Sequence, residues 1–226
     1  MGYPAGDRHE GSHAVKNLTA IILAGGRGTR MDPWKSSKCI VPLKGVPIIM
    51  RILDELAPHV DRAIVCTGYR ASDVEAALAG YEKIPLVFSN AGEDASMIAR
   101  IKKAILDNGI SQRIMINYGD EWADVDIKAM LSMHDVVGGG LSVAAHPVRL
   151  PFSVASGDFI EHYTVYAFIG WVIVSDDRLR DLLAFQGEGL SGFIASFQMP
   201  PNISYHYGKR VTFNSFHELE QAERAL

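Results

Sequence analysis

The sequence predicts an α/β fold in which a mostly parallel, mixed central sheet is covered by helices on both faces. From residue 18 onward, apolar runs of strand length alternate with amphipathic helical stretches. The connections between them are short, and such β-α-β repeats form parallel sheets. Beyond residue 147 the pattern becomes more antiparallel, which makes the predicted sheet mixed.

The strand predictions rest on short β-branched runs bounded by glycine or polar residues. The first run, LTAIILAG at residues 18–25, ends in glycines and is typical of a buried parallel strand. Further runs of this kind cover residues 62–68, 85–89, 113–120 and 141–147. Residues 154–175 are predicted to form a hairpin followed by a long strand.

Helices are predicted where apolar residues recur at helical spacing. In residues 46–58 the isoleucines and leucines share one face, and Pro58 ends the helix. The helix at 72–80 has Ser72 as its predicted cap and Gly80 as its end. The remaining predicted helices cover residues 94–109, 126–139 and 215–226.

The composition excludes several classes of protein. The chain has 226 residues, of which 48% are hydrophobic and 21% charged, as in ordinary globular proteins. A net charge of −4 provides no basic footprint for nucleic acid and no polybasic membrane signal. Cys39 and Cys66 form no CxxC pair, which fits a reducing cytoplasm. We therefore expect a cytoplasmic protein without nucleic-acid or membrane partners, and a homo-oligomer is left open.

The domain organisation is predicted to be simple. Residues 1–16 are rich in glycine, histidine and charge, and we expect them to be a disordered leader. Residues 17–226 contain no internal repeat, linker or change of composition. They are predicted to form a single domain.

A glycine-rich loop follows the first predicted strand. It combines backbone-exposing glycines with cations, namely Gly25, Gly26, Gly28, Arg27, Arg30, Lys35 and Lys38. Ligands bind beyond the carboxyl ends of strands in open sheets, so the loop predicts a polyphosphate cradle. It matches neither the Walker A nor the dinucleotide pattern, because Arg30 and Met31 stand where those patterns need glycine. A glycine-rich turn with solvated charges is the alternative.

The loop belongs to a longer pattern with a recognisable resemblance. The segment LAGGRGTRM…SKCIVPLKGVPII resembles the opening signature of the sugar-1-phosphate nucleotidyltransferases. AGEDASMIARIKKAI and YGDEWADVDIKAML are similar to the glucose-1-phosphate cytidylyltransferases of that superfamily. The resemblance covers residues 18–150 well and the last third loosely. It implies a Rossmann-like three-layer nucleotide-diphospho-sugar transferase fold and Mg²⁺-dependent transfer of CMP from CTP to a sugar-1-phosphate, with release of pyrophosphate.

The resemblance also implies roles for single residues. Thr29 and Arg30 would hold the β- and γ-phosphates, and Lys38 would bridge phosphates at the reacting centre. Asp120, at the end of a strand, is the implied Mg²⁺ ligand, and Asn214 stands where the family has a second metal aspartate. A solvated Lys38 and an Asp120 that caps a turn are the alternatives.

Further implied residues concern the base and the acceptor. The backbone of Leu23, Ala24, Gly25 and Gly26 would surround the base. Arg100 matches an arginine that contacts the pyrimidine carbonyl, with a solvated helix face beside Lys102 and Lys103 as the alternative. Glu161 and Gly170 are the implied remnants of the acceptor pocket.

The departures from the family pattern leave other functions open. Tyr163, Tyr166 and Phe168 stand where hydroxyl-binding groups are expected, which favours a cytidylyltransferase for a small phosphorylated non-sugar acceptor, a phosphoalcohol or phosphonate. Asn214 raises the alternative of a catalytically weakened, nucleotide-binding regulatory protein. Cys39 has no evident histidine partner for nucleophilic chemistry, and His134 is predicted to be structural.

Overall fold

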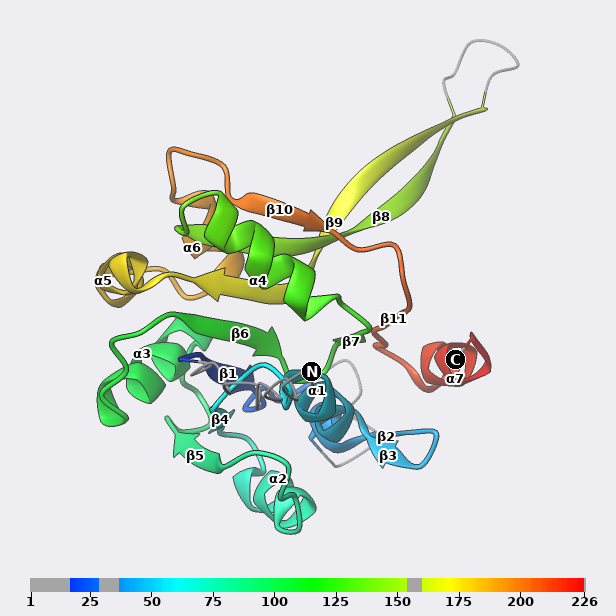
Figure 1. Cartoon of the computed structure of the whole chain (residues 1–226). Helices are drawn as coiled ribbons and strands as arrows, with labels where there is room; N and C mark the ends of the chain where they lie inside the picture. Colours follow the sequence, from blue (N-terminus) through cyan, green and yellow to red (C-terminus); the bar gives the residue numbers. More distant parts are fainter. Residues whose placement is uncertain (1–16, 29–36, 154–159, 226) are drawn as a thin grey trace, which may run out of the picture.

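The predicted α/β fold is confirmed by a computed structural model, which describes residues 17–28, 37–153 and 160–225. One seven-stranded sheet has the order β10-β8-β9-β6-β1-β4-β5 (Figure 1). Its strands are β1 (Thr19–Leu23), β4 (Arg62–Thr67), β5 (Leu86–Asn90), β6 (Ile114–Tyr118), β8 (Leu141–Ser153), β9 (Ile160–Val174) and β10 (Asn202–Tyr205). β9 is antiparallel to both of its neighbours, while the other pairings are parallel.

Helices cover both faces of the sheet and make a three-layer architecture. One apolar core contains side chains of α1 (Ile48–Leu56), α2 (Ala71–Leu78), α4 (Ile127–Val136) and α7 (Phe216–Ala225). The other contains side chains of α3 (Met97–Asp107), α5 (Asp176–Ala184) and α6 (Leu190–Ala195). In β1, Ala20 and Ile22 belong to the first core and Ile21 to the second, because side chains alternate along a strand. None of the described helices is long and apolar enough to cross a membrane.

Short elements near the carboxyl ends of the strands position the loops there. A 3₁₀ helix, η2 (Lys38–Ile40), precedes the small hairpin of β2 (Pro42–Leu43) and β3 (Val46–Pro47). β7 (Trp122–Ala123) pairs with β11 (Arg210–Val211). This second pairing brings the segment after residue 211 beside the end of β6.

Two local predictions need correction. Ser72 does not cap α2, because the helix begins at Ala71 after Arg70, which adopts a left-handed conformation with φ 51°. Residues 160–174 do not contain a hairpin of their own; they form the single strand β9, which pairs with β8 along a two-stranded arm that extends from the body (Figure 1). Residues 154–159 lie outside the described part of the chain.

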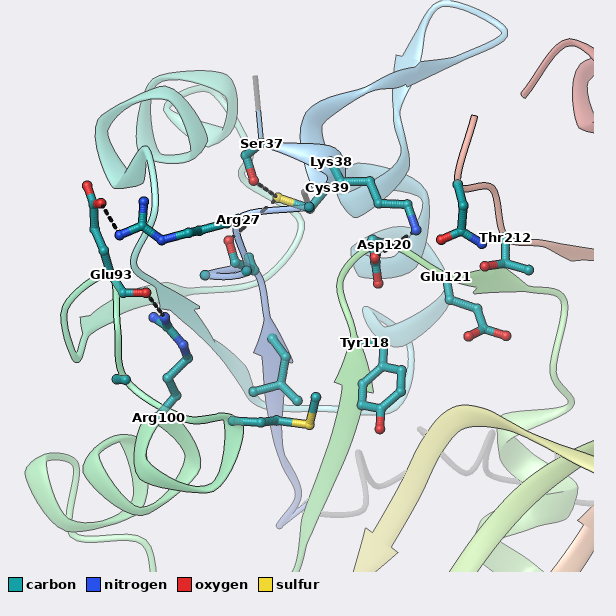
Figure 2. Close-up of a pocket in the computed structure, with 18 residues that line it drawn as sticks. Arg27, Ser37, Lys38, Cys39, Glu93, Arg100, Tyr118, Asp120, Glu121 and Thr212 are labelled. Atoms are coloured by element: carbon teal, nitrogen blue, oxygen red, sulfur yellow. Dashed lines mark hydrogen bonds and ion pairs between the residues drawn. The ribbon is translucent and has the colours of Figure 1, made fainter. Parts of the chain in front are cut away.

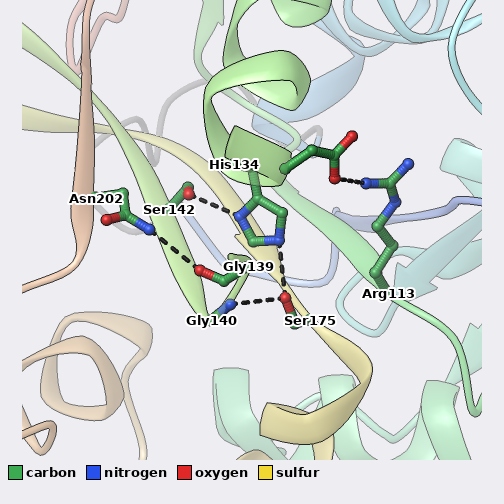
Figure 3. A network of polar contacts seen from close by, with 8 residues as sticks. Arg113, His134, Gly139, Gly140, Ser142, Ser175 and Asn202 are labelled. Atoms are coloured by element: carbon green, nitrogen blue, oxygen red, sulfur yellow. Dashed lines mark hydrogen bonds and ion pairs between the residues drawn. The ribbon is translucent and has the colours of Figure 1, made fainter. Parts of the chain in front are cut away.

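A buried histidine joins α4 to the sheet (Figure 3). The side chain of His134 is 1% exposed, and its two ring nitrogens lie 2.7 Å from Ser142 Oγ and 2.8 Å from Ser175 Oγ. Ser175 Oγ also accepts the N–H of Gly140 at 2.8 Å. These contacts agree with the predicted structural role of His134.

Replacing this histidine is expected to change how stability depends on pH. Burial lowers the pKa of His134, with a further decrease from Arg113 that Asp135 and Asp177 oppose. A lowered pKa means that His134 stabilises the fold above its unfolded value near 6.5 and that this contribution is lost as the pH falls. At pH 7.5 the free energy of unfolding of His134→Gln should be about 1–3 kcal/mol below that of wild type. Between pH 7.5 and 5 it should then decrease less than that of wild type, as measured in urea titrations. The exposed control His217→Gln should keep the wild-type decrease, and an equal decrease in all three proteins would contradict the prediction.

Candidate active site

A pocket of about 570 Å³ lies at the carboxyl ends of β1 and β6 (Figure 2). Among the residues named from the sequence, those that line it are Leu23, Ala24, Gly25, Gly26, Arg27, Gly28, Lys38, Cys39, Arg100, Asp120 and Asn214. They come from segments far apart in the chain, which meet because parallel strands end at one edge of a sheet. Thr29, Arg30 and Lys35 lie outside the described residues.

Lys38 and Asp120 meet inside this pocket. Lys38 Nζ lies 2.9 Å from Asp120 Oδ2, and the side chains are 11% and 40% exposed. The ammonium also lies 5.2 Å from the centre of the Phe213 ring. A lysine that its neighbours hold in this way is oriented before a ligand arrives, whereas a solvated loop lysine is not. An anionic ligand in the pocket would therefore meet a fixed positive charge.

The residues beside Lys38 anchor the end of the glycine-rich loop. Cys39 is 2% exposed, and its Sγ lies 3.2 Å from Ser37 Oγ and 3.9 Å from the carbonyl oxygen of Ala24. Burial raises the pKa of the Cys39 thiol to about 12, so it stays protonated at neutral pH. A nucleophilic role does not fit this environment. Cys39 instead fixes η2 against the start of the loop.

Arg100 lies in the pocket wall, so the predicted alternative of a solvated helix face is wrong. The residue is 5% exposed, and its guanidinium donates to the carbonyl oxygens of Thr67, at 2.6 Å, and Glu93, at 3.0 Å. It lies directly against the Cα atoms of Gly25 and Gly68, where any side chain would collide with it. The glycine at position 25 is thus required by the packing of Arg100, a reason that the sequence did not reveal.

This packing gives a test of the loop's structure. In Gly25→Ala the new Cβ would lie 2.2 Å from Arg100 Nη1 and 2.9 Å from the backbone carbon of Thr67. We expect the free energy of unfolding to fall by about 1–3 kcal/mol in urea titrations, because the core must shift to accommodate the methyl group. The neighbouring Gly26→Ala is a matched control, since its Cβ would meet nothing within 4 Å. Equal stabilities of the two variants would contradict the packing argument.

Arg27 also lines the pocket, but its guanidinium is paired with acidic side chains. Its guanidinium pairs with Glu93 at 3.0 Å (Figure 2). It also pairs with Asp94 at 2.9 Å and lies 5.4 Å from the centre of the Tyr69 ring. The positive charge that the sequence assigned to phosphate binding is already neutralised by these two carboxylates. Arg27 therefore links the glycine-rich loop to the segment before α3.

The sequence reasoning missed an ion pair next to Asp120. Glu121 lines the pocket, and Arg210 Nε lies 2.5 Å from its Oε1. Burial raises the pKa of Glu121, and the hydrogen bond and charge of Arg210 oppose this increase. The run YGDEW showed the second carboxylate, but no local pattern links it to an arginine 89 positions away. The pairing depends on the β7–β11 contact.

The predicted acceptor residues are less well placed. Gly170 lies on β9 with φ 73°, and a Cβ there would lie 2.8 Å from the Tyr118 ring, so it supports a residue that lines the pocket. Glu161 pairs with Phe152 in the extended arm, and its side chain is outside the described part of the structure.

A magnesium ion fits the donors of this pocket. No group of three or more His, Cys, Asp or Glu side chains that could hold a metal occurs among the described residues. Mg²⁺ keeps several waters and is commonly bound by one or two carboxylates together with substrate phosphates. The half-exposed carboxylate of Asp120 and the amide oxygen of Asn214 line the same pocket and are oxygen donors of this kind. They are suited to a metal that arrives with a nucleotide.

Comparisons with known proteins find a matching family. A family model described as "MobA-like NTP transferase domain" matches residues 20–148, more than half of the chain. A glucose-1-phosphate cytidylyltransferase of Salmonella typhimurium is 25% identical over 154 residues, which are 57% of this chain and 60% of the relative. The bifunctional protein GlmU of Geobacter metallireducens is 28% identical over 60% of this chain and 29% of the relative. The chain thus spans less than two thirds of the length of these relatives.

Solved structures share the fold. HddC from Yersinia pseudotuberculosis superimposes with a TM-score of 0.72 at 17% identity, covering 92% of this chain and 98% of that one. A Bacillus anthracis protein assigned as a glucose-1-phosphate thymidylyltransferase, solved in complex with sucrose, gives 0.76 at 16% identity, covering 92% and 94%. At this identity the likeness establishes the Rossmann-like three-layer fold and leaves the substrate to other arguments.

Proposed function

Because this chain belongs to the MobA-like NTP transferase domain family, we propose that it is a Mg²⁺-dependent nucleotidyltransferase that moves CMP from CTP to a phosphorylated acceptor. The observation that supports this best is the contact of Lys38 with Asp120, 2.9 Å apart within one pocket. Nucleotidyl transfer brings two anions together, so a site for it needs a fixed cation and a metal ligand side by side.

The reaction itself requires no covalent enzyme intermediate. An oxygen of the acceptor phosphate attacks the α-phosphorus of the triphosphate, and the bond from that phosphorus to the bridging oxygen of the β-phosphate breaks. The electron pair leaves with pyrophosphate. Lys38 stabilises negative charge at the reacting phosphates, and the backbone amides from Gly25 to Gly28 hold the leaving group with Thr29 and Arg30. The N–H of Ala24 is already donated to Cys66, at 2.9 Å, so such a cradle begins after it.

The metal would be held by Asp120, with Asn214 as a second oxygen donor. When bound there, Mg²⁺ supplies charge neutralisation at the phosphates and positions them for in-line attack. Asp120 also orients Lys38 through their ion pair. One acidic side chain thus serves both the lysine and the metal.

The choice of CTP rests on Arg100 and on the resemblance to cytidylyltransferases. The guanidinium has five N–H donors, and the two backbone carbonyls that fix it leave others for a pyrimidine oxygen. Its close approach to Gly25, whose backbone is proposed to surround the base, supports a role of Arg100 in contacting that base. A named relative acts on glucose-1-phosphate, which makes a sugar-1-phosphate the first acceptor to test.

Pyrophosphate release tests the proposal directly. The protein is incubated with Mg²⁺, one of the four common nucleoside triphosphates and a panel of sugar-1-phosphates, phosphoalcohols and phosphonates. Acceptor-dependent release that is fastest with CTP is the expected result. Tight CTP binding without release for any acceptor would instead favour a nucleotide-binding regulatory protein. Faster turnover with another triphosphate would overturn only the cytidylyl assignment.

A further inference from the structure

A second pocket lies beside Phe168, whose ring contacts that of Tyr118. It has a volume of about 260 Å³ and is formed by β8, β9, α6 and the segment after α6. Tyr118 lines the first pocket, and its ring meets Phe168 of the second pocket edge to face, with the centroids 5.6 Å apart. Ser191, which also lines the second pocket, lies near enough to Tyr118 to oppose the increase that burial causes in the pKa of the Tyr118 hydroxyl. Tyr118 of the first pocket and Phe168 of the second are therefore in direct contact where the two pockets adjoin.

The position of Tyr118 relates the second pocket to the reacting phosphates. Tyr118 ends β6, and Asp120 follows two residues later in a turn that is closed by a hydrogen bond from the N–H of Glu121 to the carbonyl oxygen of Tyr118. The opposite side of the first pocket is formed by the glycine-rich loop and Arg100, the side assigned to the nucleotide. The second pocket thus adjoins the part of the first pocket that contains Asp120, the part left for an acceptor.

The second pocket is apolar. Among its described lining residues, Ser191 has the only polar side chain. The others are aliphatic, aromatic or proline, with Phe168, Ile194 and Phe197 as the large ones. A hexose would place several hydroxyl groups against this surface, and unpaired buried hydroxyls are strongly disfavoured. A cavity of about 150 Å³ is enough for benzene, so a ring or a branched chain fits this one.

We propose that the acceptor carries a neutral apolar group, a hydrocarbon ring or a branched alkyl chain, which occupies the pocket of Phe168, Ile194 and Phe197 beyond Tyr118. This inference rests on the proposed nucleotidyltransferase function and names its acceptor class. The apolar group supplies binding energy in the second pocket, while its phosphate is held at Lys38. Tyr118 positions the acceptor because it lies where the charged first pocket adjoins the apolar second pocket.

The decisive comparison uses two acceptors with the same ring size. Cyclohexyl phosphate has the six-membered ring of glucose-1-phosphate without its hydroxyl groups. With CTP and Mg²⁺, we expect kcat/KM for cyclohexyl phosphate to exceed that for glucose-1-phosphate by at least about tenfold. An equal or higher value for glucose-1-phosphate overturns the apolar acceptor and leaves the transferase standing. Absence of pyrophosphate release with every acceptor and triphosphate overturns the transferase and this inference with it.

A variant that fills the second pocket locates the effect. Ala195 is an exposed residue of α6 that lines this pocket, and leucine is well tolerated in helices, so Ala195→Leu is expected to fold. We expect the KM for cyclohexyl phosphate to rise about tenfold or more while the KM for CTP is unchanged. The matched control Ala76→Leu, at an exposed position of α2, should change neither value. An unchanged acceptor KM in Ala195→Leu would show that the acceptor lies elsewhere.

Discussion

Lys38→Ala is expected to release pyrophosphate about 10²–10³-fold more slowly than wild type at saturating CTP and acceptor. The lost group is an ammonium that Asp120 and the Phe213 ring hold in place before the nucleotide binds. Such a group needs no reorganisation when charge develops on the phosphates, so its removal lowers kcat rather than only raising KM. The effect is measured by a coupled pyrophosphate assay under single-turnover and steady-state conditions.

The fold should survive this change. The Asp120 carboxylate left behind is 40% exposed and can be hydrated, and partly exposed ion pairs contribute little to stability, about 0–1 kcal/mol. Lys83→Ala is the matched control, because Lys83 Nζ pairs with Asp54 at 2.8 Å on the surface away from the pocket. It should keep wild-type rates. A Lys38→Ala protein that turns over at the wild-type rate would remove Lys38 from the mechanism.

The central sheet was predictable because each of its parallel strands is marked locally. A β-branched run such as residues 18–25 can be buried on both faces only within an α/β sheet, and glycine or proline marks its end. The start of α4 was equally readable, since Asp126 accepts the N–H of Ala129 as a capping residue does. Local chemistry therefore fixes most elements of the first 140 residues.

The errors arise where tertiary contacts override local signals. Ser72 has the chemistry of a helix cap, yet the left-handed Arg70 starts α2 earlier and pairs with Asp73 at 3.0 Å instead. β9 is one strand because β8 supplies a partner along its length, and a sequence window contains no information about a partner's length. The short β10 and β11 carry no strong periodicity of their own and form against β8 and β7.

The candidate site likewise contains residues that the sequence identifies and contacts that it does not. The glycine-rich loop, Lys38 and Asp120 could be named because loop chemistry and strand ends are visible in the sequence. The ion pair of Glu121 with Arg210, the ring contact of Tyr118 with Phe168 and the packing of Arg100 on Gly25 join segments up to 89 positions apart. Such contacts follow from the order of strands in the sheet, which no single stretch of sequence encodes.

Asp120→Asn is expected to lower turnover about 10²–10³-fold and to shift the Mg²⁺ titration to higher concentrations. An amide keeps the shape of the side chain and one oxygen donor, but it has no negative charge to attract a hard divalent cation. It also leaves the Lys38 ammonium, which is 11% exposed, without its counter-charge. Both effects act on the reacting phosphates, so activity and metal dependence should change together.

The control for this substitution can be matched closely. Asp73 is also 40% exposed and lies 3.0 Å from the Arg70 guanidinium, but it belongs to α2, outside the pocket. Asp73→Asn should therefore retain both the wild-type rate and the wild-type Mg²⁺ titration. If Asp120→Asn were slow but showed an unchanged Mg²⁺ titration, Asp120 would act only by orienting Lys38, and the metal would have to be held by other oxygen donors. If both variants kept full activity, the pairing of Lys38 with Asp120 would be structural and the reacting phosphates would lie elsewhere.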